Sequence, residues 1–207
     1  NIVIGYMPGD DRSQDAFDVL GTAHIMRGLC YFRLLQGWCE PWNGNSSGKD
    51  GVPLVDEFDM EAKPVRSTWD ETVAFIEKDL RKGIECNIDN SVYRFNSDVA
   101  EFILARLYFW SGNYANALEA ARSVMQKYPL VDGAEYIEMI QSSVAAKGNV
   151  LMKSYIIRES SHSLSYTGNY DYLKYKPVSK RFINDFAEKE RDVRSGISFD
   201  AKRKNLK

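Results

Sequence analysis

The sequence predicts a mostly α-helical protein in which tetratricopeptide-like hairpins form an α–α superhelix, followed by a less regular C-terminal part. Four segments have the apolar spacing of helices, and the first two of these helices resemble the next two, as in a repeat. The chain has 207 residues, of which 44% are hydrophobic, enough to bury a core. We expect a helical repeat region over 1–132, with an inserted loop at 42–66, and an irregular mixed region over 133–207 packing on the repeats.

The first helix is expected from Asp15 to about Glu40, and Pro41 ends it. Apolar residues cover nearly its whole circumference. A helix that is apolar on all sides is surrounded by other elements, so we expect Cys30 and Trp38 in the core. His24 lies on the same helix and is interpreted as a hydrogen-bonded core histidine, not as a ligand or a general base.

The second helix begins at Thr68, where the sequence Thr-Trp-Asp-Glu has the spacing of a capping box. Its apolar residues form one buried stripe: Trp69, Val73, Ile76, Leu80 and Ile84. A loop dense in turn-forming residues, 42–51, separates the two helices. Residues 51–55 then have the pattern of a short extended segment.

A third helix is expected from Ser97, as its cap, to Trp110, and Gly112 with Asn113 breaks the pattern. The fourth helix runs from Tyr114 to Tyr128. One face of it is expected to be buried: Tyr114, Ala117, Leu118, Ala121, Val124 and Met125. After Gly133 the pattern weakens to short strands at 150–152 and 155–157 and a short helix at 179–188.

The composition excludes several classes of function. The net charge is −2 and the pI about 5.8, so no overall field attracts nucleic acid or anionic lipid. The three cysteines form no paired framework. No metal-binding or catalytic motif is present, so we expect no enzyme and no cofactor. The N-terminus has no secretion signal, which indicates either a cytosolic protein or a leader that was removed.

Two aromatic segments are candidates for ligand binding. A site for neutral sugars needs flat aromatic faces for the apolar side of the ring and fixed polar groups for the hydroxyls. In the inserted loop Trp42, Asn43 and Asn45 have this character, although Trp42 can equally pack the loop onto the repeat. In the C-terminal part Tyr166, Tyr170 and Tyr172 form a second cluster, and the alternative is that they are ordinary half-buried tyrosines.

Several segments in order resemble the SusD/RagB family. The long helix at 23–34, the segment Gly51-Val52-Pro53-Leu54-Val55, and the helix that follows Pro64-Val65-Arg66-Ser67 are similar to segments of that family. The helix over 96–112 and the stretch from Pro177 to Arg194 are similar as well. The resemblance covers about Ala16 to Arg194. The sequence departs from the family in a turn lengthened by Cys39–Lys49, and its members are about twice as long.

The resemblance implies a surface-exposed lipoprotein of the outer membrane of a Bacteroidetes-type bacterium. Such a protein captures an oligosaccharide or other nutrient for a TonB-dependent, SusC-like outer-membrane transporter, and touches the membrane only through a lipid anchor that this sequence lacks. The repeat by itself leaves a second hypothesis open, a tetratricopeptide-type scaffold that binds a protein partner.

Overall fold

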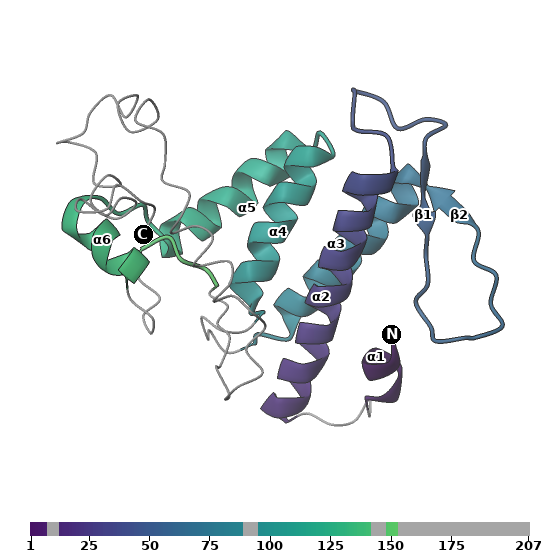
Figure 1. Cartoon of the computed structure of the whole chain (residues 1–207), viewed down its shortest axis with the longest axis horizontal. Coiled ribbons are helices and arrows are strands. Elements are labelled where there is room, and N and C mark those ends of the chain that lie inside the picture. Colours follow the sequence, from purple (N-terminus) through teal and green to yellow (C-terminus); the bar gives the residue numbers. More distant parts are fainter. Residues whose placement is uncertain (8–12, 89–94, 142–147, 153–207) are drawn as a thin grey trace, which may run out of the picture. The chain divides into compact units, whose positions relative to one another are not determined.

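The computed structural model of the protein describes residues 1–7, 13–88, 95–141 and 148–152. The chain divides into two compact units; the first extends to Leu130 and resumes at Asn149, and the second begins at Val131. The first unit contains, in order, α1 (Ile2–Tyr6), α2 (Gln14–Trp38), β1 (Asp50–Pro53), β2 (Arg66–Thr68), α3 (Trp69–Glu85), α4 (Ser97–Trp110) and α5 (Tyr114–Lys127). The predicted mostly helical fold of stacked hairpins is confirmed, and Figure 1 shows α2 beside α3 and α4 beside α5. The predicted division at 132/133 stays a prediction.

The helices begin at side-chain caps that satisfy the free N–H groups of the first turn. Thr68 caps α3 in the predicted capping box, in which its hydroxyl accepts from the Glu71 N–H and Glu71 accepts from the Thr68 N–H. The cap of α4 is Asn96 and not Ser97, because the Asn96 side chain accepts from the Val99 N–H at 2.9 Å. The Ser97 hydroxyl instead accepts from the N–H of Ile88.

Glycines allow α2 and α3 to approach closely. A Cβ on Gly83 would lie 2.3 Å from Ile25, and one on Gly21 would lie 2.7 Å from Cys86. The core between the helices contains Phe32, Ile25, Leu35, Ile76, Leu80 and Leu107, all 2% exposed or less. The predicted stripe of α3 is confirmed, with Trp69, Ile76 and Leu80 buried and Val73 and Ile84 packed against the core.

A buried polar cluster joins α2 to α3. Arg27 donates from Nε to Oδ2 of Asp79 at 2.7 Å and from Nη2 to Oδ1 at 2.8 Å, and the Nδ1 of His24 lies 2.8 Å from the same Oδ1. Asp79 is 1% exposed. Arg27 also donates to the Asn1 side chain and to the carbonyl of Asp56. The hydrogen-bonded interpretation of His24 is therefore confirmed, and the cluster also holds the N-terminus and the segment after β1.

Three expectations about helix faces were wrong. On α5 only Ala117 and Val124 are buried, whereas Tyr114, Leu118 and Met125 are 60%, 50% and 61% exposed. On α2 the outer side is not covered by another helix within the described residues, so Cys30 is exposed and Trp38 is 74% exposed. The sequence pattern marks these residues as apolar but does not show which side of each helix has a partner.

The inserted segment is anchored by a two-stranded antiparallel sheet. The predicted extended segment is β1, which pairs with β2 so that Asp50 lies opposite Thr68 and Pro53 opposite Arg66. Val52 is buried, and its N–H donates to the Thr72 hydroxyl of α3 at 3.1 Å. The sheet therefore lies against the start of α3.

The second unit holds one helix among its described residues, α6 (Gly133–Gln141), which the sequence analysis missed. Residues 150–152, predicted as a strand, have no strand structure. The other predicted strand, 155–157, and the predicted helix at 179–188 lie outside the described residues. In the described part of the chain no helix combines the length and hydropathy of a membrane span.

Candidate functional site

The candidate site lies where the inserted segment leaves α2. Its loop starts at Cys39, where the backbone becomes extended, and ends at Asp50, where β1 begins. Arg66 fixes both ends of this loop, because Nε donates to the Gly51 carbonyl at 2.8 Å and Nη2 donates to the Trp38 carbonyl at 3.2 Å. Burial raises the pKa of the Cys39 thiol, and the neighbouring Arg66 offsets this only in part. The two hydrogen bonds from Arg66 therefore hold the ends of the loop in place within the first unit.

Trp42 packs the loop onto the helices. Its ring lies 5.4 Å from that of Trp69, which in turn stacks on Trp110 at 5.9 Å with an interplanar angle of 15°. The indole also lies against the turn between α4 and α5, because a Cβ on Gly112 would lie 2.1 Å from its Nε1. The Trp69 N–H donates to the Glu40 carbonyl at 3.3 Å. Trp42 thus packs the loop onto the helices, which is the packing alternative of the sequence analysis. Trp69 lies in the core and Trp110 packs against it, as predicted.

The two loop amides are exposed but partly used in holding the loop. The ammonium of Lys49 donates to Oδ1 of Asn43 and to the Pro41 carbonyl, both at 2.8 Å. Oδ1 of Asn45 accepts from the N–H of Ser47 at 2.9 Å. Each side-chain oxygen therefore has an internal partner that fixes the direction of the amide. Fixed amides of this kind can present their N–H₂ donors to a hydroxyl-rich ligand.

Trp38 is the aromatic residue of this region that faces solvent. Gly21 of α2 lies beside Cys86, and Gly28, further along α2, lies beside Leu80, so residue numbers fall along α3 as they rise along α2. Continuing in this direction, Trp38 lies at the level of Trp69, which is the first residue of α3. The Trp69 side chain turns to Trp42 and Trp110, and Trp38 is left 74% exposed. The sequence analysis missed it as a candidate. The signal that could have found it is its position in the last turn before a loop lined with amides.

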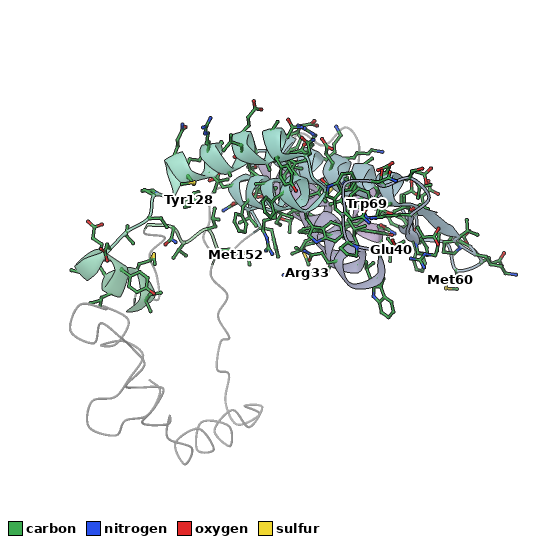
Figure 2. The ribbon with its side chains drawn as sticks, turned by 90° about the horizontal axis from the view of Figure 1, so that it is seen from above. Arg33, Glu40, Met60, Trp69, Tyr128 and Met152 are labelled. Atoms are coloured by element: carbon green, nitrogen blue, oxygen red, sulfur yellow. The ribbon has the colours of Figure 1, made fainter. Side chains whose placement is uncertain are left out.

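Among the described residues no group of three or more His, Cys, Asp or Glu side chains could hold a metal ion. Figure 2 labels Glu40, which lies two residues after Trp38 and is exposed to solvent. The second predicted cluster, Tyr166, Tyr170 and Tyr172, lies outside the described residues.

A second surface is an apolar groove of about 1410 Å³ on α4 and α5. Its lining includes Phe102, Phe109, Tyr114, Leu118, Met125 and Leu151. Arg106 supplies a charged group, and its guanidinium lies 5.8 Å from the centre of the Phe102 ring. An apolar surface of a ligand can pack into the groove, which contains few polar side chains to hydrogen-bond the hydroxyls of a sugar.

A family model matches more than half of the chain. The model of the SusD-like proteins described as "Starch-binding associating with outer membrane" matches residues 1–109. These residues include α2, the inserted loop, the sheet, α3 and most of α4. A comparison with curated proteins gives no match.

Several solved structures have similar folds. A putative sugar-binding protein from Bacteroides vulgatus is 25% identical with a TM-score of 0.56, and the match covers 63% of this chain and 31% of that one. A SusD superfamily protein from Bacteroides thetaiotaomicron is 22% identical with a TM-score of 0.73, covering 96% of this chain and 46% of that one. A laminarin-binding SusD-like protein is 18% identical with a TM-score of 0.54, covering 69% and 32%. The chain therefore spans less than half the length of each of these proteins.

Proposed function

Since the chain belongs to the SusD-like family, we propose that it is part of a cell-surface protein that binds oligosaccharides and is not an enzyme. The family is described by starch binding and by association with the outer membrane. The observation that carries the proposal is an exposed tryptophan, Trp38, at the end of α2. It directly precedes a fixed loop that presents the amides of Asn43 and Asn45.

The chemistry of the loop fits a neutral sugar. A pyranose ring has an apolar face that packs on an aromatic ring, and its hydroxyls require fixed donors and acceptors. Trp38 supplies an exposed indole. The amides of Asn43 and Asn45 are already held by Lys49 and Ser47, so little side-chain entropy is lost when a ligand binds. Trp42 contributes by holding the loop against Trp69.

The wider role is uptake. We propose that the complete protein is a lipoprotein on the cell surface and delivers the captured glycan or other nutrient to a TonB-dependent, SusC-like transporter in the outer membrane. The membership in an outer-membrane-associated family supports this role. Tyr166, Tyr170 and Tyr172 remain proposed ligand-binding residues, because aromatic residues outside the loop could extend the platform for a longer oligosaccharide.

The test is calorimetric titration of the complete gene product against a panel of plant and host oligosaccharides. Trp38→Ala should weaken binding at least tenfold, about 1.4 kcal/mol, and should change the free energy of unfolding by no more than about 0.5 kcal/mol, as for other exposed positions. Phe109→Ala is the matched control, since Phe109 is 68% exposed but lies in the groove. Unchanged affinity in Trp38→Ala would remove the loop from the site, and silence across the panel would contradict the proposal.

The apolar groove favours a second candidate function, a tetratricopeptide-type scaffold for a protein partner. An amphipathic helix that lays its apolar face into such a groove is a common mode of peptide recognition. Met125, 61% exposed on the wall of the groove, offers the test. Amphipathic helical peptides selected from a display library should bind the protein and lose binding with Met125→Glu, whereas peptides that bind both forms equally would exclude the groove.

A further inference from the structure

The segment between β1 and β2 ends in a tip with an unusual surface. Phe58, Met60 and Val65 are 65%, 86% and 82% exposed. Four carboxylates lie around these residues, Asp56, Glu57, Asp59 and Glu61, all exposed, against one lysine, Lys63. The segment 56–65, which we name the acidic loop, therefore combines a net charge of −3 with large apolar side chains in solvent.

The base of the acidic loop is held firmly. The Val55 N–H donates to the Tyr31 hydroxyl at 2.8 Å, and the side chain of Asn1 donates to the Val55 carbonyl at 2.7 Å. Arg27, itself held by the buried Asp79, donates to the Asp56 carbonyl at 3.2 Å. At the other end, Arg66 is bonded to β1 through the Gly51 carbonyl. The loop is thus presented from a fixed base on the helical core.

The tip cannot bury its own apolar residues. Phe58 and Met60 alternate with acids along the loop, and the N–H of Glu61 is turned back to Oδ1 of Asp59 at 2.8 Å. Exposed apolar groups within a polar rim mark interaction sites, and aromatic residues and methionine are enriched in protein interfaces. Figure 2 shows Met60 at the end of the first unit opposite Tyr128, a wall residue of the groove, so the tip is a separate surface.

The charge of the acidic loop selects the kind of partner. Carboxylates around an apolar anchor complement a pocket rimmed by lysine and arginine. A surface of anionic lipid would instead be repelled by them. A protein with a basic, apolar-centred surface is therefore the partner that the chemistry fits.

We propose that the acidic loop docks this protein onto its outer-membrane transporter by inserting Phe58 and Met60 into an apolar pocket rimmed by basic residues. This rests on the proposed function, which supplies the transporter as the partner. The loop acts separately from the sugar-binding region at Trp38, so docking and glycan binding can be altered independently.

The experiment uses the complete gene product and the TonB-dependent transporter encoded with it, purified in detergent, with affinity measured by surface plasmon resonance without sugar. Phe58→Ala with Met60→Ala should weaken the complex at least tenfold, since buried interface anchors dominate binding. Val19→Ala with Met26→Ala is the matched control, because these apolar residues of α2 are 48% and 47% exposed and do not line the groove. The melting temperature and the oligosaccharide affinity of each variant are measured in parallel.

A second pair of variants tests the charge. Glu57→Lys with Glu61→Lys should slow association at low salt, and the difference should shrink at high salt. Glu85→Lys with Glu119→Lys makes the same change of charge at exposed positions of α3 and α5 and should have a smaller effect. A matching effect in both pairs would show only an effect of net charge and would overturn the charge argument.

Three results would overturn the proposal itself. Unchanged transporter affinity in Phe58→Ala with Met60→Ala would show that the loop does not dock. A lowered melting temperature with an intact complex would show that the tip packs within the complete protein. A loss of oligosaccharide binding with an intact complex would place the loop in the glycan site. If the unaltered protein bound the transporter but no sugar, the glycan-binding function would fail while docking remained supported.

Discussion

Replacing Asp79 with asparagine tests how the helical core that supports the candidate site is held together. Asp79→Asn keeps the shape of the side chain and removes its charge. The carboxylate is 1% exposed and accepts two hydrogen bonds from Arg27, with a further interaction with His24. In the variant the Arg27 guanidinium, whose side chain is 13% exposed, loses its counter-charge while it remains largely buried.

The magnitude follows from this burial. Breaking a buried ion pair by removing one partner costs about 3–5 kcal/mol, because an uncompensated charge stays in the interior. The side chain of Arg27 also lies over the Phe75 ring at 5.0 Å and donates to the Asp56 carbonyl, so it cannot turn to solvent without losing these interactions. Single domains are stable by about 5–15 kcal/mol in total. We therefore expect a large part of the stability to be lost.

The same cluster gives a pH dependence with a definite sign. Burial by itself would raise the pKa of Asp79, but the hydrogen bonds from Arg27 and His24 outweigh it and lower the pKa below its ordinary value. A carboxylate with a lowered pKa stabilises the fold above the pKa of the unfolded state, about 3.9. This contribution is lost as the pH falls through the folded-state pKa. Asp79→Asn should remove this part of the acid sensitivity.

The assay is urea denaturation followed by tryptophan fluorescence, which reports on the Trp42, Trp69 and Trp110 stack. Glu85→Gln is the control, since it breaks the exposed pair with Lys82 and should leave the transition unchanged. A loss below about 1 kcal/mol in Asp79→Asn, the size found for exposed pairs, would refute the argument that a buried charge is left uncompensated.

Two further predictions concern the neighbouring packing. Gly112→Ala should cost at least about 1–2 kcal/mol and shift the tryptophan emission, since Gly112 has φ +78° and a Cβ there would collide with Trp42; a variant with native stability and emission would contradict this packing. Tyr108→Phe should cost about 1 kcal/mol, because the Tyr108 hydroxyl donates to Glu77 and accepts from Arg81. Burial, and then the bond to Glu77, raise the pKa of Tyr108 to about 12. In a spectrophotometric titration the variant should therefore lack one tyrosine that ionises with a pKa of about 12, and an unaltered titration would exclude this assignment.

The sequence by itself located the long helices α2, α3, α4 and α5 and their order. Apolar spacing located α3, α4 and α5, and the capping box fixed the first residue of α3, because these signals act within a few residues along the chain. The order of the family-like segments also indicated the family that the model of residues 1–109 shows. The loop at 42–51, with Trp42, Asn43 and Asn45, was identified from its turn-forming composition.

Only the tertiary structure decided which apolar residues have partners. Trp38 and Trp69 both have the pattern of core residues, yet Trp69 is 2% exposed and Trp38 is 74% exposed. The difference arises because Trp38 lies at the level where α3 begins, and the side chain of Trp69, the first residue of α3, turns to Trp42 and Trp110. Likewise Asp79 is a polar residue on a helix until the fold brings Arg27 and His24 around it. Periodicity records the direction of a side chain along its own helix, and burial depends on what the rest of the chain places in front of it.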